Sequence, residues 1–196
     1  MATVNLLPNA TSANDWNIVG GFGVTAHLAA NTDDGDTKYL HTTSTNNIEV
    51  DLNLDNLDFD GLNIGSITSV QVVLKARIHE RGKTYTIRTQ IQNTLGSGLY
   101  TEDLSGSSTG TYTTHTGTAR TTSDGSTAWN DAGIDGLRLS LSSHTLSGGT
   151  LRMTYCYVIV TYTPTGYSND VMGIDSGDIA EISGIATANI EKVNGI

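Results

Sequence analysis

A glycine- and serine-rich motif is the first feature of the sequence that could carry covalent chemistry. Residues 106–110 read Gly-Ser-Ser-Thr-Gly, which matches the G-x-S-x-G pattern of a nucleophile elbow. In that elbow a strained turn between a buried strand and a helix exposes the serine. The flanking residues here are serine, threonine and glycine, which favour a loop and predict neither a buried strand before the motif nor a helix after it. We therefore predict that the protein is not an enzyme.

Acidic residues at positions 31–38 could offer ligands to a metal ion. This segment reads Asn-Thr-Asp-Asp-Gly-Asp-Thr-Lys, so Asp33, Asp34 and Asp36 present the hard oxygen ligands that calcium prefers. The twelve-residue frame with a terminal glutamate, typical of an EF-hand, is absent. An acidic β-turn is the simpler interpretation, so we assign no metal site and leave calcium binding at this turn open.

Histidine and cysteine give no further metal-binding pattern. Cys156 is the only cysteine, so neither a disulfide within the chain nor a cysteine-based zinc site can form. The histidines are scattered singly, with no pair at the spacing of metal ligands: His27, His41, His79, His115 and His144. We predict no cofactor.

Aromatic rings are the side chains on which a sugar could stack. Aromatic residues make up only 6% of the chain, and the candidates are Trp16, Trp129, Tyr100, Tyr112 and Tyr167. Trp129 lies just before a predicted strand, a position typical of a core residue. Carbohydrate binding is therefore an alternative function, and it requires that these rings gather in one exposed patch.

Charge and hydropathy exclude two classes of partner. The chain has 10 lysines and arginines against 20 aspartates and glutamates, for a net charge of -10. This sign is wrong for binding a nucleic-acid backbone. No run of about 20 apolar residues is present, and the first residues lack the pattern of a signal peptide, so we expect neither a membrane anchor nor secretion.

Alternating apolar and polar residues predict the elements that must position these side chains. Apolar residues recur at every second position in 48–54, 70–78 and, apart from Thr89, in 85–91, which is typical of strands with one buried face. The turn at Arg81-Gly82-Lys83 between the last two runs favours a hairpin. Residues 151–162 are apolar or aromatic on both faces and predict a central strand, whereas a short helix is expected only around 129–134.

The fold class follows from these many short strands and turns. We predict an all-β protein in which residues 1–164 form a jelly-roll-like antiparallel β-sandwich, with residues 1–23 as an N-terminal arm. Its core should contain Val72, Leu74, Ile87, Leu139 and the strand at 151–162.

The remaining residues, 165–196, form a different segment with an internal repeat. Gly173-Ile174, Gly184-Ile185 and Gly195-Ile196 recur at intervals of 11 residues. We favour short helical turns that each end in a glycine over one continuous helix, in which Gly184 would cost about 1 kcal/mol. The segment has too little bulk to bury its own apolar residues, so we predict that these contact neighbouring subunits: Ile174, Ile179, Ile182, Ile185, Ile190, Val193 and Ile196. The alternative is that the segment covers an edge of its own sandwich.

The order of these motifs carries a resemblance to a known group of proteins. The DDGDT turn, the SVQVVLKARI strand, the TAWNDAGIDGLRLSL segment and the closing LRMTYCYVIVTYTP strand together resemble a jelly-roll module of structural proteins in tailed-bacteriophage virions. The end of the chain, ISGIATANIEKVNGI, is similar to short repeats at the ends of some phage head and tail proteins.

This resemblance implies a non-enzymatic virion protein. Its first interpretation is a capsid decoration protein, a homo-oligomer such as a trimer, that binds the major capsid protein on the head surface. The alternative is a tail, fibre or collar component that binds carbohydrate or adsorbs to the host. Neither nucleic acid nor a membrane is an expected partner. Head or tail location and copy number stay open.

Overall fold

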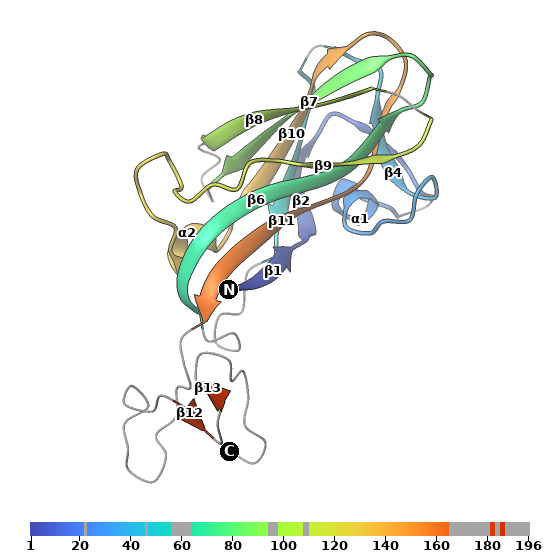
Figure 1. Ribbon diagram of the computed structural model, residues 1–196. Coiled ribbons are helices and arrows are strands. Elements are labelled where there is room, and N and C mark those ends of the chain that lie inside the picture. The colour runs from blue at the N-terminus through green and yellow to red at the C-terminus, as the bar shows by residue number, and fades with distance from the viewer. Residues whose placement is uncertain are drawn as a thin grey trace.

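Two antiparallel sheets packed face to face form the body of the protein (Figure 1). The computed structural model describes residues 1–21, 23–45, 47–55, 64–93, 98–107, 110–164, 181–182 and 185–186. Sheet A has the order β3 (Asn17–Val19), β4 (Tyr39–Thr42), β11 (Leu151–Pro164), β6 (Ile64–Ile78) and β9 (Thr113–Thr116), and β1 (Ala2–Leu6) also pairs with β11. Sheet B has the order β2 (Pro8–Asn14), β5 (Glu49–Leu54), β10 (Arg138–Leu146), β7 (Thr84–Gln92) and β8 (Gly98–Ser107). The predicted antiparallel β-sandwich is confirmed.

The core lies between the two sheets and consists of the predicted alternating residues. Val72 and Leu74 of β6 face Ile87 of β7 and Leu139 of β10 in one continuous apolar cluster, and all four side chains are buried. From β11 the buried members are Leu151, Met153, Cys156, Val158 and Val160. The period-two pattern of the sequence thus identified the buried face correctly.

The predicted hairpin between β6 and β7 is wrong. The two strands belong to different sheets, because β11 and β9 flank β6 while β10 and β8 flank β7. The turn at 79–83 therefore carries the chain from sheet A to sheet B. A short turn between two alternating strands fits either arrangement, since both strands present their apolar residues to the same core.

The first residues of the chain are strands of both sheets, where the sequence analysis predicted an arm. β1 pairs with the second half of β11, and β2 pairs with β5. The change of sheet falls between Leu6, which is buried, and Pro8. These strands close the sandwich along one edge.

Two short helices complete the body. α1 (Ala26–Ala30) packs against β2, β4 and β11. α2 (Asp131–Ile134) forms where a helix was predicted. Asn130 precedes it and accepts a hydrogen bond from the backbone N–H of Gly133 at 2.8 Å, and Gly136 ends the turn with a φ of 72°. Within the described residues, no helix has the length and apolar character needed to cross a membrane.

Two of the predicted assembly residues fall at described positions of the C-terminal segment. β12 (Glu181–Ile182) pairs antiparallel with β13 (Ile185–Ala186), so Ile182 and Ile185 lie opposite one another in a strand pair, where the sequence predicted short helical turns. The other predicted contacts lie outside the described residues: Ile174, Ile179, Ile190, Val193 and Ile196.

Replacement of Leu74 by alanine should lower the free energy of unfolding by about 2 to 5 kcal/mol, because the side chain is fully enclosed between the sheets. Urea denaturation followed by circular dichroism measures this change. Thr114→Ala, at an exposed position of β9, is the control and should change stability little. A loss below about 1 kcal/mol in Leu74→Ala would contradict the described core.

A tyrosine–histidine pair between the sheets should make stability depend on pH. The Tyr85 hydroxyl donates to the carbonyl oxygen of Ala76 at 3.1 Å and lies 2.7 Å from Nε2 of His115. Burial lowers the pKa of His115 from its ordinary 6.5, so the folded state favours the neutral ring. This contribution is complete above about pH 6.5 and is lost as the pH falls below it, since the unfolded chain then binds the proton more readily.

The expected result is a loss of stability between about pH 7 and pH 5 that is smaller in His115→Gln. Urea midpoints of the two proteins across this range measure it. Part of the slope should persist, because burial and the charge of Arg152 also lower the pKa of His41. Identical slopes in both proteins would show that His115 titrates in the folded state as it does in the unfolded chain.

Candidate functional site

An irregularity in β11 determines which of its side chains reach the surface. Leu151 and Met153 face the core, and the register with β6 shifts between Met153 and Tyr155. Thr154, the extra residue, is also buried, and its hydroxyl donates to the carbonyl oxygen of Lys38 at 3.2 Å. Such a bulge inserts one residue and resets the alternation that follows it. Tyr155 and Tyr157 therefore lie on the outer face of sheet A.

These two tyrosines pack against each other on that face. Their ring centroids are 5.0 Å apart with an interplanar angle of 39°, and both side chains are partly exposed. In the register they lie opposite Lys75 and Val73 of β6. Val73 is only 4% exposed although it points away from the core. This outer surface is thus well packed, and we call it, together with Tyr39 of β4, the tyrosine face.

The tyrosine pair lies beside a gap in sheet A. β4 pairs with residues 151–153 of β11 and β1 pairs with residues 158–162, on the same edge of the strand. Within the described part of the chain, no strand pairs with residues 154–157 on that edge. α1 packs against β11 and β4 near this gap (Figure 1). The rings are therefore flanked by β6 on one side, whereas no described strand borders residues 154–157 on the other.

The acidic turn lies across the tyrosine face and is neutralised by its cations. Nζ of Lys75 lies 2.6 Å from Oδ2 of Asp33, and Lys38 lies 3.6 Å from Asp34. The carboxylates point to different ammonium groups and do not converge on one point. No group of three or more acidic, histidine or cysteine side chains suited to a metal occurs among the described residues. This geometry argues against calcium binding at the turn.

Asp36 is the most heavily paired carboxylate of the turn. Nη2 of Arg77 lies 2.7 Å from both of its oxygens, Nη1 of Arg152 lies at 3.3 Å, and the Tyr112 hydroxyl donates at 3.1 Å. Burial alone would raise the pKa of Asp36, but the hydrogen bond from Tyr112 and the two guanidinium charges outweigh it and lower the pKa. Its carboxylate thus stays ionised and anchors the turn to the sheet.

Both guanidinium groups also stack on rings. Arg152 lies over Tyr39 and Arg77 lies over Tyr112, each at 4.7 Å from the ring centroid. Stacked arginines of this kind lose little further freedom when a ligand binds. The tyrosine face is therefore a rigid surface of alternating rings and charges.

The aromatic residues that the sequence singled out do not gather in one exposed patch. Trp16 and Trp129 are 3% and 4% exposed and belong to the core. Tyr100 lies under the guanidinium of Arg120, at 5.2 Å, and Tyr112 is committed to Asp36, as described above. Tyr167 lies outside the described residues.

The exposed tyrosines were missed because the sequence gives two conflicting phases for β11. Counting forward from Leu151 and Met153 places Tyr155 and Tyr157 in the core, whereas counting back from Val158 and Val160 places them outside. The second phase is the observed one after the bulge. The conflict between the two phases is itself the signal of a bulge.

The residues considered for catalysis are separated in the fold. The serine of the G-x-S-x-G match, Ser108, lies outside the described residues. Ser107 before it is the last residue of β8, an edge strand of an antiparallel sheet, which differs from the buried parallel strand that a nucleophile elbow needs. His27 contacts Thr11 and Thr25, and His144 contacts Arg88 and Asn47. No histidine in the described ranges is hydrogen-bonded to a serine.

The outer face of sheet B offers no comparable surface. Its polar side chains are paired with each other, as in the ion pair of Arg88 with Asp103 at 2.8 Å and the hydrogen bond from Ser140 to Glu49 at 2.5 Å. The described residues of its strands place no tyrosine, tryptophan or phenylalanine ring on this face. The tyrosine face is thus the better candidate for binding a ligand.

Comparison with solved structures finds other β-sandwiches. The CBM36-1 domain of a multidomain xylanase from the hindgut metagenome of Trinervitermes trinervoides is 8% identical, covers 84% of this chain and 100% of its own, and has a TM-score of 0.44. The C-terminal CBM6 of the laminarinase LamC from Zobellia galactanivorans is 12% identical and covers 82% and 100%, with a TM-score of 0.42. CBM29_1, a carbohydrate-binding module from Piromyces equi, is 11% identical and covers 82% and 93%, with a TM-score of 0.41. These similarities concern the fold alone.

No protein-family model and no curated protein sequence matches this chain.

Proposed function

We propose that the protein is a non-catalytic module that binds carbohydrate on the tyrosine face. The observation that carries this proposal is the pair Tyr155 and Tyr157, partly exposed on the outer face of sheet A beside Lys75. Binding sites for small polar ligands combine aromatic surface with a few fixed polar groups. The C–H face of a sugar ring is apolar enough to pack on a tyrosine, while its hydroxyls need hydrogen-bond partners.

Polar partners for such hydroxyls lie beside the rings. The side chains of Lys75 and Asp33 are 30% and 41% exposed even though they pair with each other, so both can also reach a ligand. Hydrogen bonds to ionised groups are stronger than those between neutral groups. An ammonium donor and a carboxylate acceptor at one point suit a hydroxyl, which both donates and accepts.

The rigidity of the face supports the same function. Asp36, Arg77 and Arg152 hold the acidic turn on the sheet through the contacts given above, and Thr154 ties the bulge to Lys38. A surface that is ordered before binding does not lose that entropy on binding. Side chains held in this way favour recognition of a ligand and offer no nucleophile paired with a base.

A structural role in a phage virion is a second proposal, and it rests on the sequence resemblance and on the eleven-residue repeat. In this proposal residues 165–196 attach the protein to other virion subunits, as a decoration protein of the head or a component of the tail. Among the described residues, the buried core runs from Leu6 to Tyr162 and joins both sheets, which supports a sandwich with a core of its own. A glycan-binding face on an attached sandwich is compatible with host adsorption.

Replacement of Tyr155 or Tyr157 by alanine should weaken carbohydrate binding about tenfold, because each removes one stacking surface. Isothermal titration against a panel of neutral and acidic polysaccharides measures this loss. Tyr155→Phe keeps the ring and should bind nearly as well, and Thr101→Ala, on the outer face of sheet B, is the matched control. Unchanged affinity in both alanine variants, or no binding of any polysaccharide by the native protein, would refute the proposal.

Deletion of residues 167–196 should leave the sandwich folded while abolishing self-association and virion attachment. Thermal unfolding reports the fold, light scattering reports the oligomeric state, and co-sedimentation with virions reports attachment. A truncated protein that unfolds, or one that assembles as the full chain does, would show that this segment is not the attachment element.

A further inference from the structure

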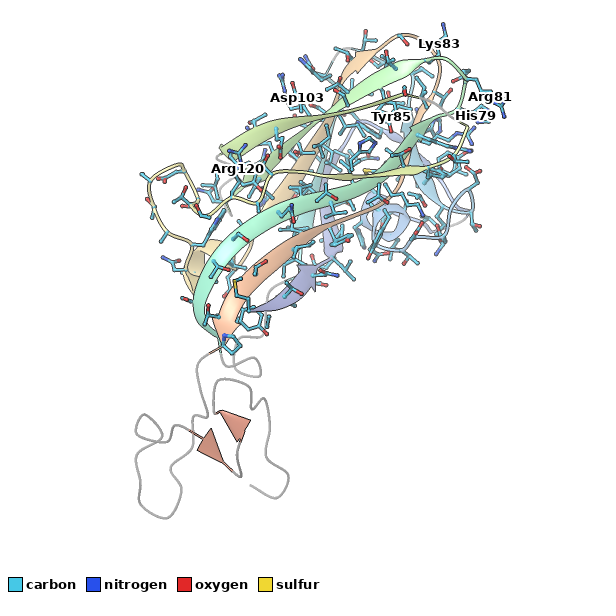
Figure 2. All side chains as sticks on the ribbon, in the orientation of Figure 1. His79, Arg81, Lys83, Tyr85, Asp103 and Arg120 are labelled. Atoms are coloured by element: carbon cyan, nitrogen blue, oxygen red, sulfur yellow. The ribbon has the colours of Figure 1, made fainter. Side chains whose placement is uncertain are left out.

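A line of basic residues runs along β6 and into the turn that follows it. Lys75, Arg77, His79, Arg81 and Lys83 stand at every second position of the sequence. On β6 this spacing places Lys75 and Arg77 on the outer face of sheet A, next to the tyrosine face. The turn carries the line to one end of the sandwich, where the last three residues gather (Figure 2). We call His79, Arg81 and Lys83 the basic tip.

The two halves of this line differ in their pairing. Lys75 and Arg77 are bound by Asp33 and Asp36, whereas Arg81 and Lys83 have no carboxylate within ion-pair distance among the described residues. Glu80 is the only acidic residue of the turn, and it accepts a hydrogen bond from the backbone N–H of Thr150 at 2.7 Å. The charges of Arg81 and Lys83 are therefore available to a ligand.

Two glycines lie beside the side chains of Arg81 and Lys83. Nη1 of Arg77 donates to the carbonyl oxygen of Gly110 at 3.0 Å, and a Cβ at Gly110 would lie 3.5 Å from Nε of Arg81. Both guanidinium groups thus lie against the same residue. On the other side, Nζ of Lys83 would lie 3.8 Å from a Cβ at Gly148. Positive charge is concentrated at this end of a chain whose net charge is -10.

We propose that the basic tip binds the anionic substituents of an acidic polysaccharide whose sugar rings lie on the tyrosine face. This inference rests on the proposed carbohydrate-binding function. The neighbouring cations already form ion pairs with carboxylates: Asp33 lies 2.6 Å from Lys75, and Asp36 lies 2.7 Å from Arg77. The same line therefore accepts carboxylate and sulfate groups in favourable geometry, since guanidinium matches both.

The charge distribution favours a polysaccharide over a nucleic acid. A net charge of -10 repels a polyanion from most of the surface, so attraction is confined to this end and orients the ligand. Asp33 and Asp36 remain 41% and 53% exposed within the site. Carboxylates there suit the many hydroxyl groups of a sugar chain and repel a continuous phosphate backbone.

Matched polysaccharide pairs test the anionic preference with the full-length protein. Dextran sulfate is compared with dextran, and polygalacturonate with its methyl ester, by titration calorimetry at about 0.05 M and about 0.5 M salt. We expect at least one acidic member to bind more tightly than its neutral counterpart and to lose that advantage at high salt. No preference for either acidic member would overturn the inference.

Substitutions that each remove one charge test whether Arg81 and Lys83 bind the anionic groups. Arg81→Gln and Lys83→Gln should each weaken binding of the acidic polysaccharide about threefold, and the double variant about tenfold, as expected for exposed charges. Arg138→Gln, which removes one positive charge from β10 of sheet B, is the matched control and should have no effect. Equal losses in all three single variants would show a general effect of net charge and would overturn the assignment to the basic tip.

Two further comparisons separate this inference from the proposed function. If Tyr155→Ala weakens polysaccharide binding while Arg81→Gln and Lys83→Gln do not, the proposed carbohydrate-binding function is supported and the proposed role of the basic tip is overturned. If neither set of substitutions changes the binding of any polysaccharide, both the carbohydrate-binding function and the role of the basic tip are overturned. Single-stranded DNA and inorganic polyphosphate that bind as tightly as the acidic polysaccharide would also overturn the inference, because charge alone would then suffice.

Discussion

The ladder between β6 and β11 is the constraint on which the rest of the molecule depends. It runs from the pair Leu151 and Ile78 to the pair Pro164 and Ile64. These two long strands therefore form the centre of sheet A, where β1 and β4 pair with β11 and β9 pairs with β6. Their inner side chains supply much of the core, and their outer side chains supply both the tyrosine face and the start of the basic line. The first of three register shifts in this ladder, the bulge at Thr154, resets the alternation of β11. This bulge places Tyr155 and Tyr157 on the outer face, where they are partly exposed.

The electrostatics of sheet A follow from where the few cations of an acidic chain are placed. Lys75, Arg77 and Arg152 lie on adjacent strands and form ion pairs with carboxylates of the turn at 31–38. Because exposed ion pairs contribute little stability one by one, the main effect of this arrangement is to hold the turn in one position. The sheet then presents charges in fixed places beside its rings, and that order is what a recognition surface requires.

Local patterns in the sequence predicted the buried faces but could not predict which strands are neighbours. Alternation identified the inward residues of β5, β6, β7 and β10, and a short helix was expected around 129–134, where α2 forms. The pairing of β6 with β11 joins residues far apart in the chain, and the turn at 81–83 holds no information about it. For the candidate site, the sequence named the acidic turn and Tyr112, whereas Tyr155 and Tyr157 depended on a bulge that simple alternation does not contain.

The antiparallel register of β6 and β11 also fixes the direction in which the chain leaves the sandwich. Ile78 and Pro164 lie at opposite ends of the ladder, which at about 3.3 Å per residue are about 40 Å apart. This distance is several Debye lengths at physiological ionic strength. The charges of the basic tip are therefore largely screened at Pro164. On approach to an anionic surface the molecule would turn its β6–β7 end forward, with Pro164 at the far end of the ladder.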